Sequence, residues 1–335
     1  MNSGLVLDRA GWQTFLMLAM DLPVRSTCAV ALLLSTSCVL GPEPMLARSL
    51  REGTYCASPL PLRPGAFPTP DVASPTTHAV EVRGYTPRAI DTARWIGALD
   101  PLERLAEAEA RGSPRAETAD LRGQVNDVIA VAMLDVSSVV ANIECEEGRA
   151  NHVAAELRDA EERQTRRLTA YSLVLSAGTA IAGGVLAISE KNQTPAGVVG
   201  IGGGVAAGTF GVATLQVHRT TTFRHPRDIL GQVWRGDAHS DFPESVWAYL
   251  SRPELTENRE RSRRDYLVQG WKESGWLGDD AAHPAPGLVA LYFGDGGTYD
   301  ADGLTHRADM LSSVSEVANL MSHDLQYLAS EAAYR

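Results

Sequence analysis

Apolar side chains recur at intervals of three and four residues through a long stretch in the middle of the chain. They are Leu121, Val125, Val128, Ala132, Val136, Val139, Ile143, Ala150, Val153, Leu157 and Ala160. This spacing is typical of an amphipathic helix or of one strand of a coiled coil. From Leu121 to Leu168 an unbroken helix would be ~70 Å long. An interior glycine costs a helix up to ~1 kcal/mol. Gly123 lies near the start of the stretch, so we expect any break at Gly148.

Two uncharged apolar arms follow this stretch, and a short polar turn separates them. The arms cover Leu168–Ser189 and Gln193–Val217. About 20 residues suffice for a helix to cross the hydrocarbon core of a bilayer, so each arm is long enough. Thr194 and Pro195, which open the second arm, suit the N-cap and the first turn of a helix. The pattern therefore predicts an αα-hairpin, either in a membrane or within a soluble helical bundle.

Small residues recur at every fourth position along each arm. They are Ser172, Ser176, Ala180 and Gly184 in the first arm, and Ala196, Gly200, Gly204 and Gly208 in the second. Such a glycine zipper lets two helix backbones approach closely. We expect Gly184, Gly200, Gly204 and Gly208 to be the helix-packing positions, within the hairpin or between copies of the chain.

The remaining patterns predict a mainly α protein. A short helix ends near Gly112, and the C-terminal part shows a helix through Phe242–Leu250 and another that Thr256 can cap. Leu288–Phe293 is expected to be a strand or an extended segment, and a final helix from near Leu304 is expected to pack on the long helix. The predicted regions are 1–40 leader, 41–88 proline-rich tether, 89–168 long helical region, 169–217 hairpin and 218–335 helical C-terminal region.

The first 40 residues have the pattern of an export leader. Arg25 precedes the short apolar run Cys28–Leu34, and small residues lead from there into Cys38. The segment Leu34–Cys38 resembles the lipobox of bacterial lipoproteins, in which the cysteine becomes lipid-modified after cleavage. It departs from that pattern because Ser35 stands where leucine is usual. The resemblance implies an envelope lipoprotein with lipid on Cys38. The alternative is a misassigned start codon in front of a cytoplasmic protein.

Prolines dominate the segment that follows the leader. They are Pro42, Pro44, Pro59, Pro61, Pro64, Pro68, Pro70 and Pro75. We expect them to exclude any regular element and to leave an extended, solvated spacer. Cys56 lies in this spacer and Cys145 in the long helix. An exported protein could pair them, and the sequence leaves this open.

Charge argues against one class of partner and leaves the orientation of the hairpin open. The net charge of −11 disfavours a general nucleic-acid binder. Arginines nevertheless flank the hairpin on both sides, at positions Arg163, Arg166, Arg167, Arg219, Arg224 and Arg227. The positive-inside rule would place both ends in the cytoplasm, whereas an exported lipoprotein would place them outside. The two signals disagree.

Each candidate for chemistry lacks part of what its site requires. Gly202, Gly204 and Ala207 superficially match a dinucleotide-binding fingerprint, but only one strand-like run, Thr220–Phe223, follows. The loop Asp300–Asp309 lacks the final glutamate of a calcium loop, and a turn before the final helix explains it better. Cys145 and His152 supply at most two zinc ligands. We therefore expect no cofactor, no metal and no catalytic site.

These patterns together predict a bacterial envelope lipoprotein with a glycine-zipper hairpin. We expect a non-catalytic, membrane-associated protein with a structural or interaction role, on the periplasmic side if the leader is genuine. Its expected partners are the lipid membrane and further copies of the chain. The alternative function is a membrane-inserting or pore-forming protein, because glycine zippers favour close homo-packing.

Overall fold

The computed structural model describes residues 45–56, 84–187, 218–237, 241–253 and 261–333, and over 171–187 it describes the backbone alone. The protein is mainly α-helical, as predicted. In chain order the elements are α3 (Met45–Glu52), η1 (Thr54–Cys56), α4 (Pro87–Ile96), α5 (Leu99–Arg111), α6 (Arg115–Ala187), β1 (Thr221–Arg224), α8 (Ile229–Arg235), α9 (Glu244–Ser251), α10 (Arg263–Glu273), α11 (Pro286–Phe293), β2 (Gly296–Tyr299) and α12 (Ala301–Ala333).

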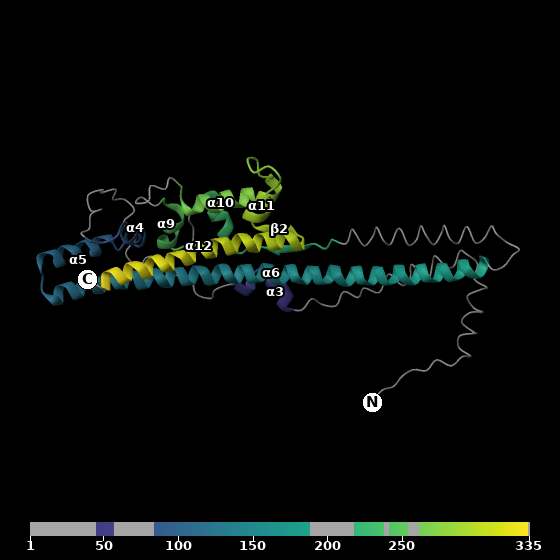
Figure 1. Cartoon of the computed structure of the whole chain (residues 1–335), viewed down its shortest axis with the longest axis horizontal. Helices are drawn as coiled ribbons and strands as arrows, with labels where there is room; N and C mark the ends of the chain where they lie inside the picture. The colour runs from purple at the N-terminus through teal and green to yellow at the C-terminus, as the bar shows by residue number, and fades with distance from the viewer. Residues whose placement is uncertain (1–44, 57–83, 188–217, 238–240, 254–260, 334–335) are drawn as a thin grey trace, which may run out of the picture. The chain divides into compact units, whose positions relative to one another are not determined.

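The longest element, α6, is a single helix of 73 residues (Figure 1). At 1.5 Å per residue it is ~110 Å long. The predicted break at Gly148 is wrong. A Cβ at Gly148 would meet nothing within 4 Å, so the position faces open space. Ile143 and Ala150, on either side of it, are completely buried. Burial of the apolar face on both sides of the glycine offsets its cost of ~1 kcal/mol.

The bundle forms because α12 and α5 both pack along α6. Figure 1 shows α12 lying beside α6, with its C-terminal end near the start of α6, so the two helices are antiparallel. At the other end of α12, Arg158 donates to Thr305 Oγ1 at 2.7 Å. Helix α5 ends at Gly112, which has φ 68°, and the chain turns back into α6. The predicted packing of the final helix against the long helix is confirmed.

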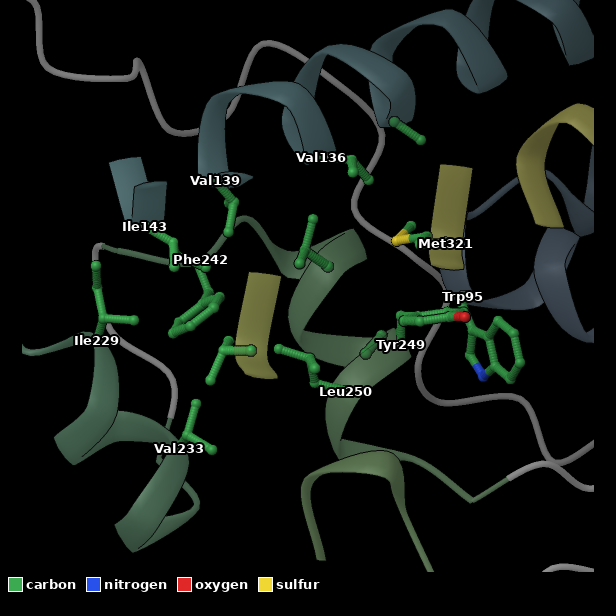
Figure 2. Packing of buried hydrophobic residues seen from close by; sticks show 14 of the residues in the cluster. Trp95, Val136, Val139, Ile143, Ile229, Val233, Phe242, Tyr249, Leu250 and Met321 are labelled. Atoms are coloured by element: carbon green, nitrogen blue, oxygen red, sulfur yellow. The ribbon is translucent and has the colours of Figure 1, made fainter. Parts of the chain in front are cut away.

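The core consists of the apolar stripe of α6 and the side chains that meet it. Buried members of the stripe are Leu121, Val125, Ile129, Ala132, Val136, Val139, Ile143, Ala150, Val153 and Ala154. Val128, a predicted member, is only partly buried. Figure 2 shows Val139 and Ile143 facing Phe242, and Trp95 of α4 beside Tyr249 of α9. The Trp95 and Tyr249 rings meet edge to face, with centroids 5.2 Å apart.

Two predictions for the C-terminal part are wrong. Leu288–Phe293 is not extended but lies in helix α11, which begins with Pro286 in its first turn, where proline needs no N–H partner. A short, uniformly apolar run has no period that separates strand from helix. The strand lies just beyond it: β2 pairs antiparallel with β1, with Thr221 opposite Tyr299. Helix α10 begins after Ser262, whose side chain accepts from the Asp265 amide in a capping box. Thr256 therefore does not cap it.

The prediction that prolines exclude regular structure from the N-terminal spacer is wrong for residues 45–56. Helix α3 and the 3-10 turn η1 lie between Pro44 and Pro59. Ala47, Leu50 and Cys56 are buried there, and this burial gives the short helix a tertiary partner that its sequence alone does not reveal.

Replacing Gly148 with alanine should stabilise the protein. The helix continues through this position, and space for a Cβ is open. We expect the free energy of unfolding to rise by about 0.5–1 kcal/mol, measured by urea denaturation.

Gly231→Ala is the matched control, because a Cβ at Gly231 would lie 2.5 Å from the Phe293 carbonyl oxygen and would also meet Asp228. It should destabilise the protein. A loss of stability in Gly148→Ala would contradict the continuous helix.

Candidate functional site

The base of the predicted hairpin is the first candidate site. Past Arg158, α6 extends beyond the start of α12. The chain is beside α6 again at Arg219, whose backbone N–H donates to Glu161 Oε1 at 2.6 Å. The Arg219 guanidinium also donates to Gln164 Oε1, at 2.6 Å from Nη2 and 3.1 Å from Nε. The segment between Gln164 and Arg219 therefore leaves and rejoins the body at one place.

The helical part of this segment has the length of a bilayer crossing. From Leu168 to Ala187 the backbone of α6 is helical throughout. Those 20 residues rise ~30 Å, which equals the thickness of a hydrocarbon core. The first predicted arm is thus helical as far as Ala187.

Between Arg115 and Ala170, α6 is also long enough and apolar enough to cross a membrane. In the most apolar stretch of this part, 33% of the residues are buried within the protein. The buried stripe described above explains that part of its apolar character, because it forms the core of the bundle.

The predicted site residues fall largely outside the described part of the chain. Gly184 lies within α6, where the backbone is helical. Cys38, Gly200, Gly204 and Gly208 lie outside the described residues. So do the hairpin turn, the whole second arm and the dinucleotide-like glycines. Lipid attachment and glycine-zipper packing therefore stay predictions.

A second candidate site is a buried polar junction where the N-terminal segment meets α6. Cys56 and Cys145 form a disulfide with Cα atoms 5.8 Å apart, which answers the question that the sequence left open. Four residues further along α6, Arg149 pairs with Glu146, and both side chains are at most 1% exposed.

The donors of Arg149 are shared among three segments. Nη1 donates to the carbonyl of Leu50 at 2.7 Å, and Nη2 to that of Arg224 at 2.8 Å. Its guanidinium also lies 3.9 Å from the centroid of the Phe223 ring. One side chain of α6 therefore fixes α3 and β1 together, with the charge compensated by Glu146.

Behind Arg149 lies a second group of buried polar side chains. Tyr299 donates to the Leu291 carbonyl at 2.7 Å, and its hydroxyl lies 3.1 Å from His225 Nε2. Arg307 donates to the Tyr292 carbonyl at 2.8 Å. Burial, and next the nearby Arg307 charge, lower the pKa of His225 from 6.5 to about 2. Burial lowers the pKa of Arg307 to about 10. His225 is therefore neutral in the folded protein at every physiological pH.

Sequence reasoning missed this junction, although a signal for it exists. Glu146 continues the spacing of the apolar stripe between Ile143 and Ala150. A charged residue at a core position needs a buried partner, and Arg149 follows one turn later. The two possible zinc ligands nearby have other partners. Cys145 is in the disulfide, and His152 lies 3.4 Å from Glu156. Among the described residues, no group of three or more side chains is placed to hold a metal ion.

A third candidate is an aromatic cleft of about 570 Å³ on the C-terminal half of the body. Its lining includes Trp95, Tyr249, Tyr266, Trp271 and Trp276. Asp324, only 3% exposed, accepts from Tyr249 at 3.0 Å and from Arg88 Nε at 2.6 Å. The volume and the aromatic lining suit a small organic ligand.

The polar side chains of the cleft are held by contacts to its aromatic residues. The Arg263 guanidinium lies over two neighbouring rings, 3.8 Å from the Tyr249 centroid and 4.8 Å from that of Trp95. The Ser313 hydroxyl, also in the lining, accepts from Trp271 Nε1 at 3.0 Å. The described lining contains neither histidine nor cysteine, so it offers Ser313 no imidazole as a base.

No family model, curated protein or solved structure matches this chain.

Removing the disulfide should release α3 from the body. The bond closes a loop with a sequence separation of 89 residues, so the Cys56→Ser/Cys145→Ser variant should lose about 2–4 kcal/mol of unfolding free energy. We expect faster trypsin cleavage after Arg48 and Arg51, detected by mass spectrometry of timed digests.

Dithiothreitol should reproduce this cleavage in the wild type and add nothing in the variant. Unchanged protection of Arg48 and Arg51 after reduction would show that non-covalent contacts such as those of Arg149 suffice to hold α3.

His225 should make the protein less stable in mild acid. Its folded pKa of about 2 lies below its ordinary value of 6.5, so below pH 6.5 the unfolded chain binds a proton that the folded chain does not. Stability is lost as the pH falls through that value. Between pH 7 and pH 5 we expect a loss of about 2 kcal/mol from this group, measured by urea denaturation at each pH.

His225→Gln should flatten this dependence, whereas His283→Gln, at an exposed position, should keep it. Equal slopes in wild type and His225→Gln would refute the assignment to His225.

Proposed function

We propose that this is a non-catalytic, membrane-associated protein of the bacterial envelope with a structural or interaction role. In this proposal segment 168–217 lies in the bilayer as a helical hairpin, and the helical body stands on the membrane surface. The observation that carries it is the return of the chain to Gln164 after a helical, apolar extension of bilayer length. From Gln164 to Ala187 α6 rises ~35 Å, and a return helix of about the same length fits the residues that remain before Arg219.

The disulfide supports the envelope location. Cys56 and Cys145 are bonded, and such bonds persist in oxidising compartments such as the periplasm. It also bears on the disagreement between the leader and the flanking arginines. The positive-inside rule is a statistical bias, whereas a buried structural disulfide needs an oxidant to form. The proposal therefore places the body outside the cytoplasm.

The direction of α3 supports a common membrane for the lipid and the hairpin. Cys56 bonds to Cys145, whereas Arg51 lies 3.9 Å from Glu156, further along α6. Going backwards along the N-terminal segment therefore leads toward Leu168 and the hairpin. Cys38 lies only seven residues before Met45, a reach of at most ~25 Å. A lipid on Cys38 and the hairpin can therefore enter the same bilayer.

Carbonate extraction of membranes tests this proposal. Wild type should remain in the membrane fraction at alkaline pH, and Cys38→Ser should remain there too if the hairpin is embedded. Release of Cys38→Ser alone would show that lipid is the only anchor. Release of both proteins would reject membrane embedding.

The zipper and the pore alternative need separate measurements. Gly204→Leu should weaken assembly or stability, because a large side chain separates backbones that pack closely. Gly123→Leu, where a Cβ meets nothing within 4 Å, is the control. Release of an entrapped dye from liposomes by wild type would favour a pore, and intact liposomes at every protein concentration would reject it.

A further inference from the structure

Arginines outnumber acidic residues at the point where α6 leaves the body, where Glu161 and Glu162 are the acidic side chains in contact with them. The two chain segments at this place are 163–170 and 218–220, and they contain Arg163, Arg166, Arg167 and Arg219. We call these four residues the basic collar. The last acidic residue before the apolar arm is Glu162. The collar contrasts with a chain whose net charge is −11.

The collar side chains face solvent. All four arginines are exposed. Arg166 pairs with Glu162, and the side chain of Arg166 is still 75% exposed. The Arg219 guanidinium donates to the neutral amide of Gln164, and the nearby carboxylate of Glu161 accepts from the Arg219 backbone N–H. Among the described residues, Arg163 and Arg167 take part in no ion pair.

This arrangement is unfavourable for an isolated helix. Arg163 and Arg167 are four residues apart, and Arg166 is adjacent, so three like charges lie on one face within about one turn. Arg219, on the segment that leads into β1, adds a further positive charge beside Glu161 and Gln164. Such a cluster is stabilised when an anionic surface lies against it.

We propose that the basic collar binds the phosphate headgroups of anionic phospholipids in the leaflet that the body faces. This inference rests on the proposed insertion of the hairpin, because insertion places the collar at headgroup level, directly outside the hydrocarbon core. Arg163 to Arg167 end immediately before Leu168, where the apolar arm begins. Guanidinium groups donate several hydrogen bonds to phosphate, which gives the contact geometry as well as charge. The collar should therefore prefer lipids whose headgroups carry a net negative charge over lipids with neutral headgroups.

Flotation of purified full-length protein with vesicles tests the inference. The probes are vesicles of phosphatidylcholine alone and of phosphatidylcholine with phosphatidylglycerol. Wild type should partition more strongly onto the anionic vesicles, and added salt should reduce the difference. The Arg163→Gln/Arg166→Gln/Arg167→Gln variant should lose roughly fivefold in partition for each arginine, on the order of 100-fold in all, on anionic vesicles.

Two matched variants separate the collar from general charge effects. Arg104→Gln/Arg111→Gln/Arg115→Gln removes the same charge from exposed positions at the other end of the body and should bind like wild type. Replacing the three collar arginines with lysine should keep most of the binding, which also shows that the fold tolerates changes there.

The possible results separate headgroup binding by the collar from membrane association of the protein as a whole. Equal partition of wild type onto neutral and anionic vesicles, or equal losses in both glutamine variants, would overturn the collar while leaving membrane association in place. Absence of flotation with either vesicle would overturn the proposed membrane function itself.

Discussion

The fold depends on the burial of one ion pair, Arg149 with Glu146, at the centre of α6. Burying two ionised groups that are at most 1% exposed is costly, and the carbonyls of Leu50 and Arg224 supply acceptors for Arg149 from outside the helix. Oε1 of Glu146 has no hydrogen-bond partner among the described residues. The cost of burying the charge is thereby tied to the position of α3 and β1. The disulfide four residues earlier holds the same N-terminal segment covalently. Without its carbonyl partners, Arg149 would be a buried charge with unmet donors, so the segments around it are fixed as a group.

Much of the architecture follows from apolar spacing, and the errors have identifiable causes. The stripe from Leu121 to Val153 predicts α6, and the corresponding pattern after Leu304 predicts its partner α12. Both are long enough for the period to be unambiguous. Leu288–Phe293 is too short for that, and it is helical because proline begins it and the strand lies beyond it. Gly148 breaks no helix because its neighbours are buried, a fact of tertiary structure that helix propensity does not contain.

The candidate sites were less predictable, because they depend on residues far apart in the sequence. The pairing of Cys56 with Cys145 depends on the position of α3, and the proline-rich composition of that segment does not predict a helix. Arg219 and Gln164 lie on either side of the whole apolar segment in the sequence, and they are in contact in the structure. The sequence shows the apolar pattern of the hairpin, but it does not show which residues meet at its base. The cleft around Asp324 draws on α4, α9, α10 and α12, and its aromatic residues look like ordinary core until those elements are assembled.

The continuity of α6 has a consequence for how the body moves relative to the apolar arm. A hinge at Gly148 would have let the bundle tilt independently of the hairpin. Because α6 is one helix from Arg115 to Ala187, with α12 packed along it as far as Arg158, the body follows the orientation of the apolar arm. The contacts of Arg219 with Glu161 and Gln164 add a second link at the base of the apolar arm. The cleft is therefore held in a fixed direction relative to the part of the apolar arm that ends at Ala187.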